Sequence, residues 1–153
     1  LSEELRFPPI GIKAKTEDSY QDYPDFLLQR DKLLECWDDY DRAARGLKIN
    51  KPDIGSKLLG WPDILRDNMT VECELVSRGY CLSEGLGSVT PRDRQEAVQS
   101  SAKEWLLLFQ LDSAEVGGLG RMLGDGGRIY YYIRKEDLSV GRFDRVWTVT
   151  QRS

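Results

Sequence analysis

The chain has 153 residues, of which 40% are hydrophobic and 31% are charged, and its formal net charge is −4 at pH 7. These hydrophobic and charged fractions are typical of a globular domain, and the acidic net charge argues against a general nucleic-acid binder. No apolar run approaches the roughly 18 residues that a membrane-spanning helix needs. Histidine is absent, which removes Ser-His and Cys-His nucleophile pairs as well as histidine metal ligands.

The first part of the chain predicts one edge strand and one long helix. Prolines at positions 8 and 9 precede loosely alternating residues, which suits an edge strand from about 10 to 15. Apolar residues then recur at three- and four-residue steps, and they predict an amphipathic helix over 24–45. Residues 47–67 are rich in glycine, proline and asparagine, and we expect an ordered loop that carries apolar anchors.

Two further helices are predicted in the middle of the chain, with unequal support. The apolar residues of 69–78 fit the spacing of a strand and also that of a helix, and both alternatives stay open. The helix is favoured because Gly79 is a suitable stop. Thr90 and Pro91 are typical of a helix start, as cap and first helical residue, and this helix should extend to about residue 103.

The last third of the chain predicts three strands, near 105–112, 128–134 and 144–150, with a helical turn or two in KEDLSVG. The glycine-rich connection over 113–127 is short enough to join antiparallel neighbours. The expected fold class is therefore α+β, a mostly antiparallel β-sheet covered by helices. In that fold the helix over 24–45 packs on the sheet.

The segment GDGGR, residues 124–128, can be interpreted as a phosphate-binding loop or as a tight turn. A dinucleotide fingerprint needs glycines at i, i+2 and i+5 between a strand and a helix, and a P-loop needs Gly-Lys, and neither pattern occurs here. The following residues predict a strand, so no helix N-terminus faces a phosphate. We interpret Asp125-Gly126-Gly127 as a tight turn with positive φ, at which Asp125 and Arg128 make polar contacts.

Three cysteines, Cys36, Cys73 and Cys81, form an odd set without tight spacing. Such a set argues against a disulfide framework and predicts a reducing, cytoplasmic setting. The acidic residues match no calcium loop, and no cofactor fingerprint is present, so we expect neither a metal nor a cofactor.

Four motifs follow one another along the chain: LLGWPD, LLFQLDS, GDGGRIYY and FDRVW. In this order they resemble the YwqG-like family of uncharacterised, mostly bacterial proteins. The resemblance implies that residues 1–153 are a single domain of this kind or the C-terminal part of a longer member. Ser56 and Leu123 depart from the family pattern, which often has His and Trp at these places. Since the family has no established activity, the resemblance implies a fold more than a function.

Polar residues of these motifs cluster at strand ends and in loops, where a rigid sheet commonly positions binding residues. We predict that six residues line one concavity that binds an unknown protein or a small polar ligand: Trp61, Asp63, Gln110, Asp112, Asp125 and Arg128. The competing interpretation is structural, with Gln110 and Asp112 holding loop backbone groups and Arg128 pairing with Asp112 or Asp125. The favoured function is a non-catalytic binding or protein-interaction module. The alternative is a carboxylate-based hydrolase or small polar ligand binder.

Overall fold

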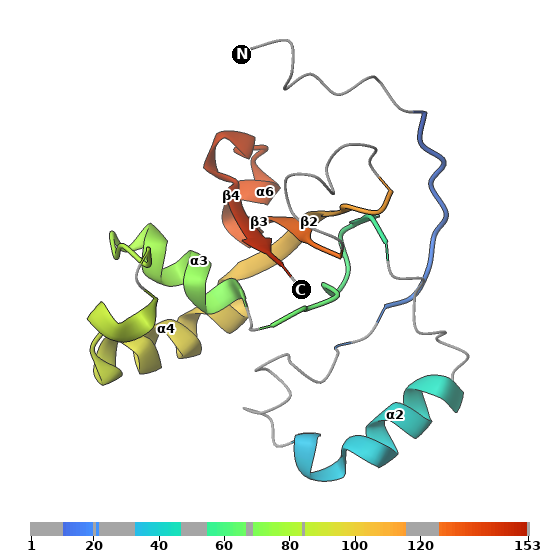
Figure 1. Cartoon of the computed structure of the whole chain (residues 1–153), viewed down its shortest axis with the longest axis horizontal. Helices are drawn as coiled ribbons and strands as arrows, with labels where there is room; N and C mark the ends of the chain where they lie inside the picture. Colours follow the sequence, from blue (N-terminus) through green and yellow to red (C-terminus); the bar gives the residue numbers. More distant parts are fainter. Residues whose placement is uncertain are drawn as a thin grey trace.

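The protein is described by a computed structural model that covers residues 11–19, 21, 33–46, 55–66, 69–83, 85–115 and 126–152. Its strands form one antiparallel sheet in the order β1-β2-β3-β4 (Figure 1). The strands are β1 (Lys57–Leu58), β2 (Trp105–Asp112), β3 (Arg128–Arg134) and β4 (Trp147–Gln151). The α-helices are α2 (Trp37–Gly46), α3 (Met69–Ser77), α4 (Pro91–Glu104) and α6 (Lys135–Ser139). Helices and an antiparallel sheet together confirm the α+β class.

The central pair, β2 and β3, has the bounds that the sequence predicts. The two strands are antiparallel and pair from Trp105 opposite Arg134 to Asp112 opposite Arg128, with one shift of register between them. The N–H of Ser113 donates to the carbonyl of Gly127 at 3.0 Å, directly beyond the last pair. Gly126 has φ of 86°, a left-handed conformation that glycine adopts without a steric penalty. The turn interpretation is therefore confirmed at Gly126, while Asp125 lies outside the described residues.

A β-bulge in β2 decides which of its side chains face the core. The register shifts between Leu107 and Phe109, so Leu108 is an extra residue relative to β3. Trp105 and Leu107 are buried before the bulge, and Gln110 and Asp112 are buried after it. Because side chains alternate between the two faces of a strand, the extra residue changes the phase and turns Gln110 and Asp112 to the same face as Trp105.

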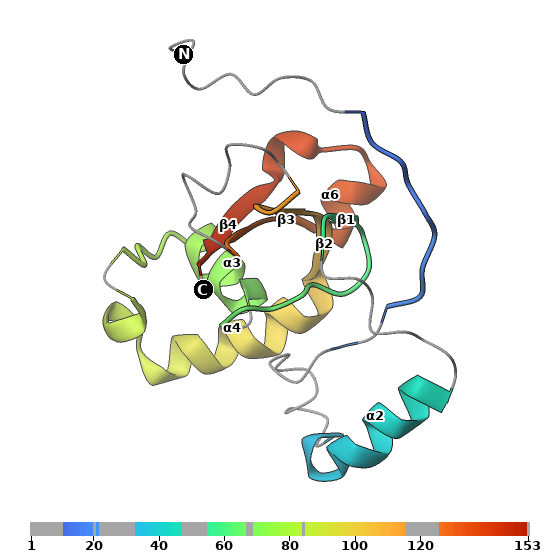
Figure 2. The same ribbon diagram turned by 45° about the vertical axis from the view of Figure 1, so that its right-hand side comes forward.

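The core lies against this face of the sheet. One cluster of buried side chains contains Ile64 from the loop before α3, Met69 and Cys73 from α3, and Trp105, Leu107, Tyr130, Tyr132 and Val149 from the sheet. A second cluster joins α3 to α4 through Leu75, Val89 and Ala97. Figure 2 shows α3 and α4 side by side, as in Figure 1. Of the segment 69–78, for which strand and helix were both open, Met69–Ser77 is a helix, and Met69 and Cys73, one helical turn apart, both face the core.

The start of α4 follows the prediction closely. Thr90 has extended backbone angles, φ −65° and ψ 151°, and its hydroxyl accepts a hydrogen bond from the N–H of Asp93 at 3.2 Å. Pro91 occupies the first helical position, where a missing N–H has no cost. The helix ends at Glu104, one residue beyond the expected end.

Several predicted elements differ from the structure. Residues 11–15 form no strand and are exposed, because no described strand lies beside them. Of the helix predicted over 24–45, Leu33–Cys36 forms a 3-10 helix and Trp37–Gly46 an α-helix, while positions 24–32 lie outside the described residues. In both views α2 lies apart from the sheet, so the predicted packing of this helix on the sheet is not seen (Figures 1 and 2).

Smaller differences concern two strands. The two-residue strand β1 falls inside a segment predicted as loop, because two residues carry no alternation that a pattern could reveal. β4 begins at Trp147 rather than 144, because Phe143–Arg145 forms a 3-10 turn. Among the described residues, none of the helices combines the length and the apolar character that crossing a membrane requires.

Candidate functional site

Four of the six predicted site residues lie together. Gln110 and Asp112 come from the end of β2 and Arg128 from the start of β3, while Asp63 belongs to the loop over 55–66 that runs beside them. With Lys57 of β1 they form one connected set of hydrogen bonds and ion pairs, which we call the loop-side cluster: Lys57, Asp63, Gln110, Asp112 and Arg128. The sequence prediction that these residues meet is therefore supported by the geometry.

Asp63 is held at its backbone and at its side chain. Its carboxylate accepts from Lys57 Nζ and from Gln110 Nε2, each at 2.7 Å. Its N–H donates to Gln110 Oε1 at 2.9 Å, and its carbonyl accepts from Tyr130 Oη at 2.7 Å and Arg128 Nη1 at 3.1 Å. With this many partners, Asp63 has little freedom to move, and the loop is fixed at this residue.

Gln110 connects the loop to the sheet at two residues, Gly55 and Asp63. Its side chain is fully buried, and its amide nitrogen donates to the carbonyl of Gly55 at 2.7 Å as well as to Asp63. The loop is held again at its far end, where Gln151 Oε1 accepts from the N–H groups of Leu65 and Arg66 at 3.0 and 3.2 Å. These glutamines replace the strand partners that an irregular loop lacks, which a buried backbone requires.

Asp112 and Arg128 form a buried ion pair, with Nε donating to Oδ2 at 2.8 Å and side chains that are 5% and 8% exposed. Burial alone would lower the pKa of Arg128, but the hydrogen bond to Asp112 and the contact with Tyr130 outweigh it and raise the pKa above its ordinary value. The other oxygen of Asp112 accepts from the N–H of Ala114 at 2.9 Å. The pairing expected for Arg128 is thus made with Asp112.

Trp61 does not join this set through its side chain. Its N–H donates to Ser19 Oγ at 3.0 Å and its carbonyl accepts from Lys57 Nζ at 3.4 Å, while its residue surface stays 36% exposed. Leu58 and Leu59, on the same loop, are 71% and 46% exposed. We call Leu58, Leu59 and Trp61 the apolar tip. A single concavity shared by Trp61 and the polar residues is therefore not what the described contacts indicate.

The backbone at the apolar tip is unusual. Leu59 has φ of 61° and Gly60 has φ of 77°, so two consecutive residues are left-handed. Leu59 is the one described residue other than glycine with a positive φ. The conformation is uncommon for a bulky side chain and costs about 1–2 kcal/mol. The conformation is maintained because hydrogen bonds hold the loop on both sides of Leu59. One of them is donated by the N–H of Leu59 itself to the carbonyl of Leu108 at 3.1 Å.

A second buried polar set lies at the other end of the core and was not predicted. Glu74 of α3 is 4% exposed, and its carboxylate accepts from Trp105 Nε1 at 2.9 Å, Arg78 Nε at 2.8 Å and Arg134 Nη2 at 2.9 Å. With a further contact from Ser100 Oγ at 3.2 Å, the helix-side cluster consists of Glu74, Arg78, Ser100, Trp105 and Arg134. The sequence alone does not distinguish a buried glutamate in the middle of a helix from an exposed one.

The charge state of Glu74 follows from these partners. Burial raises its pKa, but the hydrogen bonds from Trp105 and Arg78 and the positive charges of Arg134 and Arg78 outweigh burial and hold the pKa below its ordinary value. Arg134 also lies 4.7 Å from the ring centroid of Trp105, in cation–π geometry. The helix-side cluster therefore joins α3 and α4 to β2 and β3 through charged groups.

Neither cluster presents a free reactive group. Within the described part of the chain, each buried side-chain nitrogen or oxygen has a hydrogen-bond partner. The same residues contain no group of three or more acidic or cysteine side chains placed to hold a metal ion. The thiol of Cys73 is buried, and burial, with the charge of Glu72, raises its pKa. The polar side chains of both clusters thus contact one another and the backbone around them.

Comparison with known proteins gives one match. A family model described as a domain of unknown function, DUF1963, matches residues 6–151. No curated protein and no solved structure matches the chain. An uncharacterised family was expected from the four motifs, and the match agrees with that expectation, while the YwqG-like name itself stays a prediction.

Proposed function

Since the chain belongs to the DUF1963 family, whose description names no activity, we propose from its geometry that it is a non-catalytic binding module. In this proposal the apolar tip contacts a partner protein, and the loop-side cluster holds the tip in place. The expected setting is the cytoplasm, in keeping with three free cysteines. The bacterial origin implied by the motifs belongs to the same proposal.

The observation that carries the proposal is the conformation of Leu59. A leucine at this position is strained by its φ of 61° and leaves 46% of its surface in water, so the burial of its side chain does little to offset the strain. Backbone strain of this kind persists where the surrounding structure enforces it, and it concentrates at ligand-binding sites. A glycine would adopt the same backbone without strain, so the leucine side chain is best explained by a contact outside this chain.

Rigidity of the loop supports the same conclusion. Leu58 and Leu59 lie between Lys57 and Asp63, whose side chains form an ion pair at 2.7 Å, and Asp63 is fixed to β2 and β3. A preformed apolar surface loses little conformational entropy on binding, which is the usual property of an interface anchor. Tryptophan is also among the residues that most often dominate binding energy at protein interfaces.

The roles first predicted for Asp63, Gln110, Asp112 and Arg128 change in this proposal. They position the tip instead of touching the partner, because their polar groups are already engaged within the chain. The rival proposal, a carboxylate-based hydrolase or small polar ligand binder, needs acids whose oxygens can reach a substrate. In Asp63 and Asp112 both carboxylate oxygens already have partners.

Site-specific photocrosslinking in cells that make the protein tests the proposal. A benzophenone amino acid is placed at Leu58 and, as the matched control, at Val140, because both residues are 71% exposed. We expect a discrete protein adduct from position 58 that position 140 does not give, and we expect Trp61→Ala in the same chain to abolish it without lowering the melting temperature. Equal labelling at the two positions, or an adduct that survives Trp61→Ala, would contradict the proposal.

A further inference from the structure

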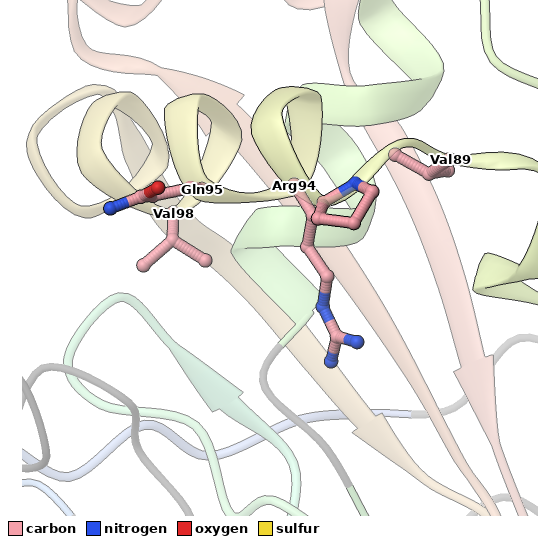
Figure 3. A pocket seen from close by; sticks show the side chains of 5 residues that line it. Val89, Arg94, Gln95 and Val98 are labelled. Atoms are coloured by element: carbon pink, nitrogen blue, oxygen red, sulfur yellow. The ribbon is translucent and has the colours of Figure 1, made fainter.

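A shallow hollow lies on α4, and none of the residues that line it belongs to either cluster described above. It has a volume of about 350 Å³ and is lined by Val89, Pro91, Arg94, Gln95 and Val98 (Figure 3). In Figure 3 the side chains of Arg94 and Val98, one helical turn apart, project from the same side of α4. Pockets for small molecules commonly have volumes of about 300–1,000 Å³, so this hollow fits a ligand of small size.

The base of the hollow is rigid. Val89 is 8% exposed and belongs to the core cluster that it forms with Leu75 of α3 and Ala97 of α4. Thr90 fixes the first turn of α4 by accepting a hydrogen bond from the N–H of Asp93 at 3.2 Å. The apolar wall at Val89 and Pro91 is therefore preformed, and a ligand would not have to order it.

Arg94 is the charged group of this lining, and the acids beside it are engaged elsewhere. The carboxylate of Asp93 accepts from the Thr90 hydroxyl at 2.6 Å, and that of Glu96 accepts from Arg92 Nε at 3.0 Å. The guanidinium of Arg94 makes no hydrogen bond or ion pair with the described residues. An exposed cation thus stands at the rim of an apolar hollow, and no acid among the described residues pairs with it.

We propose that this hollow binds a small carboxylic acid with a short apolar tail. The carboxylate pairs with the guanidinium of Arg94, whose planar fork can donate two parallel hydrogen bonds. The tail lies against Val89, Pro91 and Val98, and Gln95 offers a further polar contact at the edge. A neutral alcohol of the same length gains only the apolar part of this interaction, and an amine is repelled by Arg94.

Nuclear magnetic resonance titration of the full chain with hexanoate, hexanol and hexylammonium tests the proposal. We expect hexanoate to shift the amide signals of residues 89–98 and to bind about fivefold more tightly than hexanol, the factor that corresponds to an exposed ion pair. Hexylammonium should bind most weakly of the three. Because salt screens exposed charges, high ionic strength should reduce the preference for hexanoate over hexanol.

Two variants separate the role of Arg94 from a general charge effect. Arg94→Gln should bind hexanoate and hexanol equally, whereas Arg92→Gln, which removes a cation paired with Glu96 outside the lining, should keep the preference. Equal affinity for hexanoate and hexanol in the wild type, or an unchanged preference in Arg94→Gln, would overturn the proposal. A peptide ending in a free leucine that binds more tightly than hexanoate would overturn the choice of a small free acid as the ligand.

Discussion

The loop-side and helix-side clusters occupy opposite ends of the same core, and they stabilise different kinds of structure. In the helix-side cluster, Glu74 receives four side-chain donors, so the cluster joins regular elements to one another. In the loop-side cluster, side chains bond mainly to the backbone of the loop, as Gln110 does with Gly55 and Asp63. The difference shows that buried polar groups serve here as links between elements and as substitutes for missing strand pairs.

The two clusters should affect local stability in different ways. Removing a link in the helix-side cluster should weaken the packing of α3 against the sheet as a whole, since its members come from both helices and both central strands. Removing a loop contact should free the loop while the sheet keeps its pairing. The ion pair between Asp112 and Arg128 is the exception, because it is buried and also bridges β2 and β3.

The largest effect is expected from Arg128→Ala. The substitution leaves the carboxylate of Asp112 buried without its cation, and breaking a buried pair costs about 3–5 kcal/mol of the free energy of unfolding. Urea denaturation measures this loss in the free energy of unfolding. Arg142→Ala is the control, because Arg142 pairs with Asp144 at the surface and its loss should leave the urea midpoint unchanged. Equal midpoints for the two variants would remove the distinction between this pair and a surface pair.

Glu74→Gln tests the helix-side cluster and its dependence on pH. The substitution removes the anion of Arg134 and leaves Arg78 with the carboxylate of Glu96, 4.0 Å away, and we expect a loss of about 3 kcal/mol in the free energy of unfolding at pH 7. Because the folded-state pKa of Glu74 lies below its ordinary value of 4.5, its contribution is complete above 4.5 and is lost as pH falls through the folded-state pKa.

The difference between wild type and Glu74→Gln should therefore shrink as pH falls below 4.5. Denaturant unfolding over a range of pH values measures this convergence. The exposed glutamate Glu136 supplies the control, since Glu136→Gln should follow the wild type at each pH. A difference that stays constant through the acidic range would mean that the charge of Glu74 contributes nothing to stability.

Gln110→Ala should show the local effect that distinguishes the loop-side cluster. It leaves the carbonyl of Gly55 and the N–H of Asp63 without their partner, which costs about 2 kcal/mol of stability. Hydrogen exchange should accelerate over residues 56–66 while the paired amides of β3 keep their protection. Gln95→Ala, on the exposed surface of α4, is the control and should change neither. Uniform acceleration across the sheet would show that Gln110 is a general core residue.

Sequence patterns revealed the loop-side cluster better than the helix-side cluster, for a physical reason. Gln110 and Asp112 are polar residues at the end of a continuous apolar strand, and Arg128 begins the next strand, so their meeting follows from antiparallel pairing. Glu74 lies in a helix whose other acid, Glu72, is exposed. Its burial depends on Trp105 and Arg134, which reach it from strands that the chain forms later.

Other features could not be derived from the sequence because they depend on the register of the sheet. The bulge at Leu108 turns Gln110 and Asp112 toward the core, and nothing in the run LLLF marks the extra residue. The hydrogen bond from the hydroxyl of Tyr130 to the carbonyl of Asp63 at 2.7 Å likewise requires the loop that contains Asp63 to lie beside β3. The turn at Gly126 was predictable, because glycine there needs only local chemistry.

The smallest effect on folding is expected at the apolar tip that the loop-side cluster holds. Leu59→Gly relieves the strain of a left-handed leucine but increases the conformational freedom of the unfolded chain, and the two terms nearly cancel. We therefore expect the free energy of unfolding to change by less than about 0.5 kcal/mol, while the crosslinked adduct from position 58 disappears. A clear gain in stability together with an unchanged adduct would show that Leu59 contacts no partner. Gln110→Ala should weaken the same adduct by loosening the loop, which would connect the polar contacts of Gln110 to the exposed surface that they position.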